Sequence, residues 1–283
     1  MTGLNSLCRI PLAGVLAAGL LTTAFTAPIV AGPAAAAEIK LAHFMSPRHP
    51  MDRFLMRPWA EEVAKATNNA LTVRIYPGGA LGKGPVAQFK RAVDGVADVT
   101  FGLPGFTSKL FPRTGVIELP GVAKGVTLAA LGAVPVFMPI NRVYNALNTG
   151  VIDGVMTGPS TIGSFKFDEV AKYFTTGLPL GRSPFFLVMN RDTWKKQSDA
   201  HKDVIRKTTG RAFSIKGSAF YIKAGKAGLA KVAASPDHEV IVMKGAALDE
   251  AVDALMKSRA AQVADLEKQG VPAGKILAAM GVK

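Results

Sequence analysis

Hydrophobic and polar positions alternate along the early part of the chain in a way that predicts strands and helices in turn. The segment 39–44 alternates like a strand, and segment 54–66 carries apolar residues at the spacing of one helix face. A second strand is expected at 71–76, a helix at 86–93 and a third strand at 97–101. Because strands and helices alternate, this part predicts a parallel α/β lobe.

The next part repeats that order incompletely. Apolar spacing predicts the tail of a helix at 126–131, a strand at 134–138, a helix at 141–147 and a strand at 153–156. These segments match the second strand, second helix and third strand of the early part. The counterpart of the first strand is absent from the sequence. We therefore predict a second lobe that begins in mid-unit, with a deletion near Gly125.

The rest of the chain is expected to be mainly helical. The predicted helices are 167–174, 200–234, 248–268 and 273–280, and the predicted strands are 185–189 and 239–243. Asp192 or Thr193 could open a further helix. The helix 200–234 is expected to break locally near Gly217 and Gly225, since glycine lowers helix propensity.

A short pattern recurs in the two parts. Ala92, Gly95, Asp98, Gly102 and Pro104 correspond to Ala146, Gly150, Asp153, Gly158 and Pro159. The spacings differ by single residues, so the recurrence indicates related construction and not a clean duplication. Two α/β lobes that face each other commonly hold a small molecule between them.

The amino terminus reads as a cleavable export signal. Arg9 supplies a positive start, the segment 11–30 is apolar, and the alanines at 34–37 offer a small-residue cleavage site before Glu38. A transmembrane anchor is the alternative, but two prolines and a glycine interrupt the apolar stretch. We predict a signal peptide at 1–37 and a periplasmic location.

Composition narrows the classes of function. The only cysteine, Cys8, lies in the predicted signal, so a core and not disulfides must stabilise the mature chain. The formal net charge of +14 falls to +13 when Arg9 is removed, since the signal has no acidic residue. So basic a chain could attract an anionic ligand or simply carry a solvated basic surface. Export and the lack of a basic block with interleaved aromatics argue against nucleic acid as a partner.

No metal-ligand cluster, nucleophile elbow or P-loop is found, so no catalytic residue, metal or cofactor is predicted.

Several motifs together resemble one family. They are SPRHP at 46–50, IYPGGALG at 75–82, AVDGVADV at 92–99 and LGAVPVFMPINRVYNALNTGVIDG at 131–154. With them the chain resembles the solute-binding proteins of tripartite ATP-independent periplasmic (TRAP) transporters, of the dicarboxylate-binding type, over nearly all of its mature length. The resemblance implies an α/β, two-lobed periplasmic binding protein fold, type II-like, with a long helix across the lobes. It also implies capture of a small organic acid anion and its delivery to membrane permease subunits.

The sequence departs from the family at one point. Members carry a strand written K-I-R-x-P before the LGAxPVxMP segment, and its Arg grips the ligand carboxylate. Here Gly125 is followed by Val-Thr-Leu-Ala, and a piece on the order of 60 residues, two strand–helix units, is missing. The second lobe is therefore expected to be incomplete. The predicted division is a signal peptide at 1–37, lobe one at 38–125, lobe two at 126–190, and a crossing strand, long helix and C-terminal helices at 191–283.

Most candidate ligand-binding residues are expected at strand ends facing a cleft, and Arg182 precedes a returning strand near the expected hinge. They are His43, Arg48, His49, Phe101, Gly102, Thr157, Gly158 and Arg182. A forked guanidinium suits a carboxylate, and histidine can donate to one. Each also has an ordinary alternative: a surface arginine, a loop cap, a tight turn or a core aromatic.

Three functions remain open from the sequence. The first is an organic-acid-binding protein of a TRAP transporter. The second is a weakly binding or non-functional remnant of such a protein, because the carboxylate-gripping strand is missing. The third is a periplasmic enzyme on the same fold, since fold alone does not fix function.

Overall fold

The structure is a computed structural model that describes residues 36–82, 84–107, 109–118, 129–136, 138–180 and 184–282. The predicted signal peptide therefore lies almost wholly outside the described residues. So do Gly125, the first half of the helix tail expected at 126–131, and the candidate Arg182.

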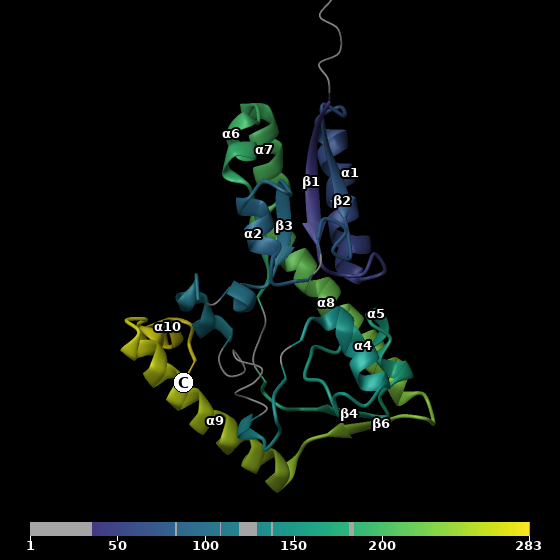
Figure 1. Cartoon of the computed structure of the whole chain (residues 1–283), viewed down its shortest axis with the longest axis vertical. Coiled ribbons are helices and arrows are strands. Elements are labelled where there is room, and N and C mark those ends of the chain that lie inside the picture. The colour runs from purple at the N-terminus through teal and green to yellow at the C-terminus, as the bar shows by residue number, and fades with distance from the viewer. Residues whose placement is uncertain are drawn as a thin grey trace, which may run out of the picture. The chain divides into compact units, whose positions relative to one another are not determined.

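A four-stranded mixed sheet forms the centre of the first lobe (Figure 1). The strands β1 (Ala37–His43), β2 (Leu71–Tyr76) and β3 (Val99–Gly102) are parallel, and β5 (Phe186–Met189) pairs antiparallel with β3. The order across the sheet is β2-β1-β3-β5. The three early strands and their parallel arrangement were predicted from the sequence and are confirmed.

Helices connect these strands as expected. A π-helical turn, η1 (Asp52–Met56), leads into α1 (Arg57–Ala66), and α2 (Gln88–Val93) precedes β3. Leu55 and Trp59, from η1 and α1, lie in one buried cluster with strand residues of the sheet. Burial of these large apolar side chains stabilises the first lobe, because each removes a large apolar area from water.

Asp98 ties the sheet to the segment that follows β5. One of its carboxylate oxygens accepts from the backbone N–H of Lys40 at 2.8 Å, and the other accepts from the Thr193 hydroxyl at 2.7 Å. Thr193 belongs to α6 (Arg191–Lys196), which Asn190 caps. The bounds predicted for the lobes remain a prediction. The strand β5 lies within the range 126–190 that was predicted for lobe two, and it pairs with the sheet of the first lobe.

The second lobe is built around a smaller sheet. Its two strands, β4 (Tyr173–Thr176) and β6 (Glu239–Val242), pair in parallel. Three helical pieces precede them: α4 (Ile140–Asn148), α5 (Thr161–Ser164) and the 3-10 turn η4 (Phe167–Glu169). The predicted helix at 141–147 is confirmed by α4. The incomplete second lobe expected from the sequence is also what the structure contains.

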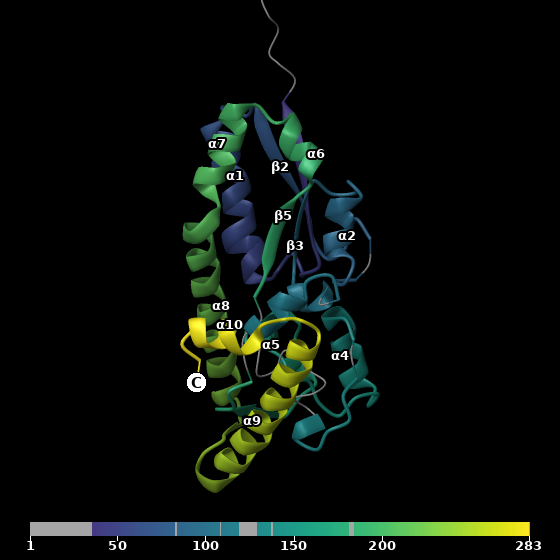
Figure 2. The same ribbon diagram turned by 90° about the vertical axis from the view of Figure 1, so that its left-hand side faces the viewer.

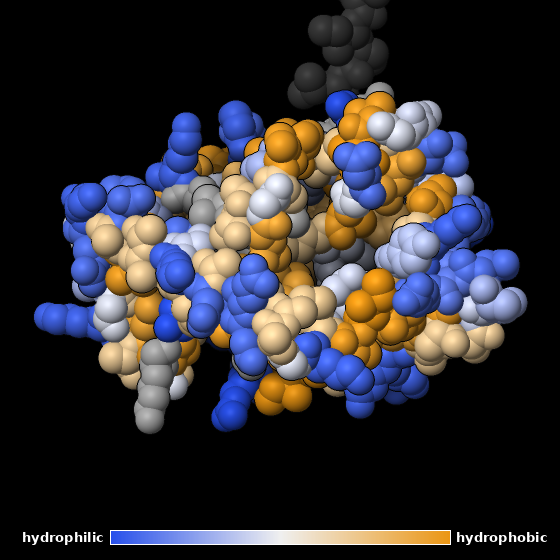
Figure 3. Space-filling model, turned by 90° about the horizontal axis from the view of Figure 1, so that it is seen from below, coloured by the Kyte–Doolittle hydropathy of each residue, from blue (hydrophilic) through white to orange (hydrophobic). Residues whose placement is uncertain are grey.

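Two predicted strands of this lobe are wrong. Neither the described residues of 134–138 nor segment 153–156 forms a strand. The side chain of Val134 is 90% exposed. An isolated strand leaves its backbone N–H and C=O groups unpaired, so it needs a neighbour that the described part of this lobe does not offer. Apolar side chains are accordingly open to solvent, and Figure 3 shows such side chains among polar ones on the face seen from below.

The predicted amphipathic helix at 167–174 is also wrong. The segment forms the single turn η4 and then enters β4. Tyr173 pairs with Glu239, so β6, far along the chain, decides the conformation. Apolar spacing over so short a segment fits either structure, and long-range pairing wins here.

Long helices follow, as predicted, but the interruption lies elsewhere. The break separates α7 (Asp199–Thr208) from α8 (Gly210–Ala233), at Thr209. Gly217 and Gly225 lie inside the continuous helix α8, so the break predicted near them is wrong. Both are buried because other elements approach the helix there: an added Cβ would lie 3.0 Å from Leu55 and from Pro159 respectively. Figure 2 shows α7 and α8 running down one side of the ribbon.

The chain ends with α9 (Gly245–Lys268) and α10 (Ala273–Ala279), close to the predicted bounds. Gly270 separates them with a left-handed φ of 79°. α10 packs on α9 and on a 3-10 segment, η3 (Pro112–Glu118), around buried Val116, Val271 and Leu277.

The recurring sequence pattern corresponds to a recurring helix end. Gly95 and Gly150 follow α2 and α4 with φ of 70° and 68°. The next residue bonds back in the same way in both: Val96 N–H to the Arg91 carbonyl at 3.0 Å, and Val151 N–H to the Ala146 carbonyl at 2.9 Å. This is a Schellman cap, which glycine favours. The copies differ on either side of this shared helix end. The first has β2 before it and β3 after it, whereas the described residues of 134–138 and segment 153–156 form no strand.

Candidate functional site

The last residue of β1, His43, and the loop after it, with Arg48 and His49, carry three of the candidate residues and lie at the carboxyl end of the parallel strands. The turn after β2 packs beside it, because Gly78 N–H donates to the Met45 carbonyl at 2.8 Å and Gly79 N–H to the His43 carbonyl at 3.2 Å. In open α/β sheets this edge is where ligands bind. The loop is therefore held where a binding residue is expected.

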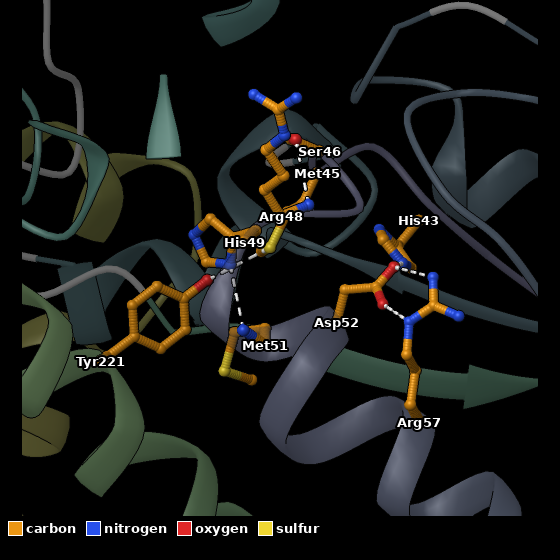
Figure 4. A network of polar contacts seen from close by, with 9 residues as sticks. All are labelled: His43, Met45, Ser46, Arg48, His49, Met51, Asp52, Arg57 and Tyr221. Atoms are coloured by element: carbon orange, nitrogen blue, oxygen red, sulfur yellow. Dashed lines mark hydrogen bonds and ion pairs between the residues drawn. The ribbon is translucent and has the colours of Figure 1, made fainter. Parts of the chain in front are cut away.

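His43 takes part in a buried ionic network (Figure 4). Its Nε2 lies 3.0 Å from a carboxylate oxygen of Asp52, and the Arg57 guanidinium forms an ion pair with the same carboxylate. Asp52 and His43 are fully buried. Since a buried carboxylate is costly without partners, this network fixes the start of η1 under the loop. Whether His43 also touches a ligand stays a prediction.

His49 is buried and neutral. Burial lowers its pKa from 6.5 to about 4, the nearby His43 adds to that effect, and Asp52 opposes it. Its Nδ1 lies 3.2 Å from the Met51 N–H, which assigns Nδ1 as acceptor and puts the proton on Nε2. Within the described ranges no hydrogen bond engages this Nε2. It is thus a neutral N–H donor.

A chain of aromatic contacts from four different segments leads to His49, and two of its rings, Tyr221 and Phe165, contact the imidazole. The Tyr221 ring meets the His49 ring edge-on at 5.4 Å between centroids, Phe185 stacks on Tyr221 at 5.1 Å, and Phe101 stacks on Phe185 at 5.0 Å. Phe165 lies on another side, 6.2 Å from His49. We call these five residues the aromatic cluster. It brings the candidates His49 and Phe101 into one assembly.

Tyr221 reaches the loop from α8. Its hydroxyl lies 3.6 Å from the Met45 sulfur, and burial raises its pKa well above the usual value. The hydroxyl is therefore neutral at all ordinary pH values. The ring and the loop hold each other in place across a long sequence separation.

Arg48 is the exposed cation of the loop. Its backbone N–H donates to the Ser46 hydroxyl at 3.2 Å, and its guanidinium points away from the His43–Asp52–Arg57 network (Figure 4). The charge of Arg48 is felt at Lys166, where it opposes the rise in pKa that the hydrogen bond to Glu169 causes. Two cations from different segments thus lie close enough to interact.

Glu169 is shared between two donors. Lys166 donates to it at 2.6 Å and the Tyr144 hydroxyl at 2.9 Å, and both bonds lower its pKa. Lys166 and Glu169 are exposed and Tyr144 is partly exposed, so the interactions are weak. Tyr144, from the most specific family motif, thus acts here as a surface hydrogen-bond donor.

The candidates Thr157 and Gly158 precede α5. The Gly158 carbonyl accepts from the Thr161 hydroxyl at 2.7 Å, and that hydroxyl lies 3.5 Å from Thr157 Oγ1. The loop docks on α8, where an added Cβ at Gly228 would lie 2.7 Å from the Pro159 carbonyl oxygen. Their predicted role as ligand contacts remains a prediction.

Gly102 has a packing role. A Cβ there would overlap the ring of Phe186, the residue opposite it on β5, so glycine makes room for that ring. In the part of the chain that the structure describes, no group of three or more His, Cys, Asp or Glu could hold a metal ion.

Sequence reasoning missed four residues that build this site: Asp52, Phe165, Phe185 and Tyr221. The last three reach His49 or Phe101 only through long-range packing, and no local pattern indicates that. Asp52 did carry a signal, since an acidic residue shortly after two histidines and ahead of Arg57 can pair with either kind of side chain.

Comparison with known proteins identifies the class. Residues 122–260 match the sequence profile of the bacterial extracellular solute-binding proteins, family 7. This stretch includes α4 and α8.

Two relatives align with shorter segments. The C4-dicarboxylate-binding periplasmic protein DctP of Rhodobacter capsulatus is 40% identical over 65 residues, which are 23% of this chain and 19% of the relative. The sialic acid-binding periplasmic protein SiaP of Vibrio cholerae is 33% identical over 92 residues, 32% and 28% of the two chains. The aligned part thus spans less than a third of either relative.

Solved structures share the fold over a greater length. A marine metagenome TRAP solute-binding protein specific for aromatic acid ligands superposes with a TM-score of 0.76 at 23% identity, over 85% of this chain and 96% of the other. The TRAP solute-binding protein of Rhodoferax ferrireducens, solved with copurified benzoate, gives 0.73 at 20% identity, over 86% and 96%.

The fold is therefore that of the two-lobed periplasmic binding proteins, with an incomplete second lobe. In sequence the chain is similar to the family 7 solute-binding proteins over residues 122–260, and in fold it is similar to TRAP solute-binding proteins. The family is extracellular or periplasmic. None of the helices among the described residues has the length and hydropathy needed to cross a bilayer.

Proposed function

We propose that the mature chain captures a small organic acid anion in the periplasm and presents it to the permease subunits of a TRAP transporter, without chemical turnover. The observation that carries this proposal is the neutral His49, whose Nε2–H is unengaged by the described residues and lies beside the aromatic cluster. A preformed N–H donor in a dry, apolar setting suits a carboxylate oxygen, because hydrogen bonds to charged groups strengthen where water is excluded.

Charge comes from the loop and its neighbour. Arg48 is exposed on the same loop as His49, and Lys166 lies near it. In the absence of the family's carboxylate-gripping strand, we assign Arg48 the role of the cation that attracts and pairs with the anion. A pair formed by an exposed guanidinium is weaker than a buried one, so we expect modest affinity.

Among organic acids we favour those with an aromatic ring. The cluster offers ring edges and faces from Phe165, Phe185 and Tyr221, and rings pair favourably with other rings in edge-on or offset arrangements. The two structural neighbours described above are, by their descriptions, specific for aromatic acids or bound to benzoate. The relative DctP is described as binding C4-dicarboxylates, so succinate is the matched alternative.

One observation supports the alternative of a weakly binding remnant. Residues 133–136 form no strand and expose Val134 almost completely, where the second lobe was expected to pair a strand. If the missing piece is essential, the lobes cannot close on a ligand.

A thermal-shift screen separates these functions. The mature chain is heated alone and with millimolar benzoate, 3-hydroxybenzoate, mandelate or succinate, each as the sodium salt against sodium chloride. A ligand that binds only the native state raises the melting temperature. We expect a cooperative transition that moves upward with an aromatic acid. A broad transition that no acid shifts would favour the remnant, and consumption of the acid would favour an enzyme.

A further inference from the structure

The helix α8 carries an unusual charge for its length. It contains five basic residues, Arg211, Lys216, Lys223, Lys226 and Lys231, and no acidic residue. Lys231 pairs with Asp168. The other four are exposed, and in the described ranges no acidic side chain forms an ion pair with them. This part of the surface is therefore a concentrated source of positive potential.

Apolar side chains lie among these cations. Ile215 and Ile222, two turns apart, are 59% and 61% exposed. With Arg211, Ser214, Ser218 and Ala219 they form a shallow surface of α8 that is wide open to solvent. We call this side of the helix the basic face of α8. Large aliphatic side chains left in water on a rigid helix indicate a surface that meets something less polar.

The opposite side of α8 is anchored. Gly217 approaches Leu55, and Gly225 and Gly228 approach Pro159, so the helix cannot rotate to bury its isoleucines without losing these contacts. Figure 2 shows the helix along one side of the ribbon, next to α7. At 1.5 Å per residue its 24 residues extend about 36 Å. The basic face is thus a rigid, fixed strip.

We propose that the basic face of α8 docks the protein on an anionic lipid surface. Helices that lie in the plane of a membrane interface combine exposed apolar side chains with flanking lysines and arginines, which is the pattern here. The isoleucines would enter the headgroup region, and the four free cations would neutralise acidic headgroups. This inference goes beyond ligand binding and does not depend on it.

The exposed isoleucines favour lipid over an acidic protein helix. Aliphatic side chains standing among four cations suit an interface in which anionic headgroups overlie an apolar layer. Each cation near an anionic membrane adds about fivefold to the binding constant, and the effect falls off within a Debye length. Binding is therefore expected to be salt-dependent.

The test is flotation of the purified mature chain with vesicles. Vesicles of phosphatidylcholine alone are compared with vesicles holding 30% phosphatidylglycerol (on the order of the acidic fraction needed for a surface potential of tens of millivolts), at low and high salt. We expect binding to the anionic vesicles only, and release at high salt. The double variant K216E/K223E should lose binding at least tenfold, and I215S/I222S should weaken it severalfold, with far-UV circular dichroism unchanged.

The matched control makes the same change in net charge on helices other than α8. Lys257 and Lys275 are exposed on α9 and α10, so K257E/K275E alters the net charge equally. This control should bind vesicles nearly as well as the native chain. Equal loss in both double variants would overturn the proposal, because net charge alone would then explain binding. Failure of the native chain to bind anionic vesicles would also overturn it. An acidic protein would then be the alternative partner of the basic face of α8.

Discussion

The ring of His49 lies edge-on against the ring of Tyr221, 5.4 Å between centroids, although one follows the first strand and the other lies on a late helix. This contact fixes the imidazole while Met51 N–H engages Nδ1. The orientation of Nε2–H is thus set before a ligand arrives. Preorganised donors of this kind lower the entropic cost of binding.

Replacing His49 by Phe should separate donor chemistry from packing. H49F keeps an aromatic ring against Tyr221 and removes the Nε2–H donor, so we expect affinity for a carboxylate to fall about tenfold or more. H49Q restores a donor and should fall less. H201F, on α7 outside the aromatic cluster, is the control and should bind normally. Titration calorimetry measures each, and unchanged affinity in H49F would remove His49 from the site.

The pH dependence of stability should report the buried imidazole. The pKa of His49 is about 4 in the folded protein against 6.5 ordinarily, so between these values the unfolded chain binds a proton that the folded chain does not. The contribution is fully present above pH 6.5 and is lost as the pH falls toward 4. We expect the free energy of unfolding to drop by about 3 kcal/mol over that window.

Urea titrations at pH 7, 6, 5 and 4 measure this loss. The variant H49Q has no imidazole at this position and should show a flatter dependence, whereas H201Q should follow the native curve. A dependence in H49Q as steep as in the native chain would mean that other groups cause the loss.

Gly228 should be intolerant of a side chain. In G228A the new Cβ would lie 2.7 Å from the Pro159 carbonyl oxygen and 3.2 Å from Ile162, so the loop before α5 must move away from α8. Overpacking of this kind costs about 1–3 kcal/mol. The control is G163A, where nothing lies within 4 Å of the added atom. Urea unfolding of both variants tests the contact, and equal stabilities would contradict it.

The predicted signal cleavage has a direct readout. Export of the full chain to a bacterial periplasm should yield a mature protein that begins at Glu38, seen by intact mass. This would shorten β1 only by Ala37, whose N–H donates to the Ala70 carbonyl at 2.9 Å. Retention of residues 1–37 on the recovered protein would contradict the prediction.

The first lobe follows from the sequence because its elements are local. β1, β2 and β3 alternate or cluster apolar residues over short segments, and helices between them force parallel pairing. The second lobe does not follow in the same way. Segment 153–156 has the apolar run of a strand without a neighbour to pair with, while β4 becomes a strand only because β6 is available.

The candidate site shows the same limit. The loop with His49 could be identified because it follows a strand, but Tyr221 and Phe185 join it through packing between distant segments. The sequence around Tyr221 and Phe185 does not distinguish them from ordinary core residues. The residues next to His49 in the sequence also do not indicate that its side chain is buried, and so they do not indicate that the imidazole is neutral.

Titration calorimetry of benzoate and succinate into the mature chain tests the central claim most directly. We expect saturable, one-to-one binding of at least one of these acids, tighter for benzoate, and a few-fold weaker in R48M because the exposed pairing cation is gone. The absence of saturable heat with benzoate, its hydroxylated relatives and succinate, in a chain that still melts cooperatively, would contradict it.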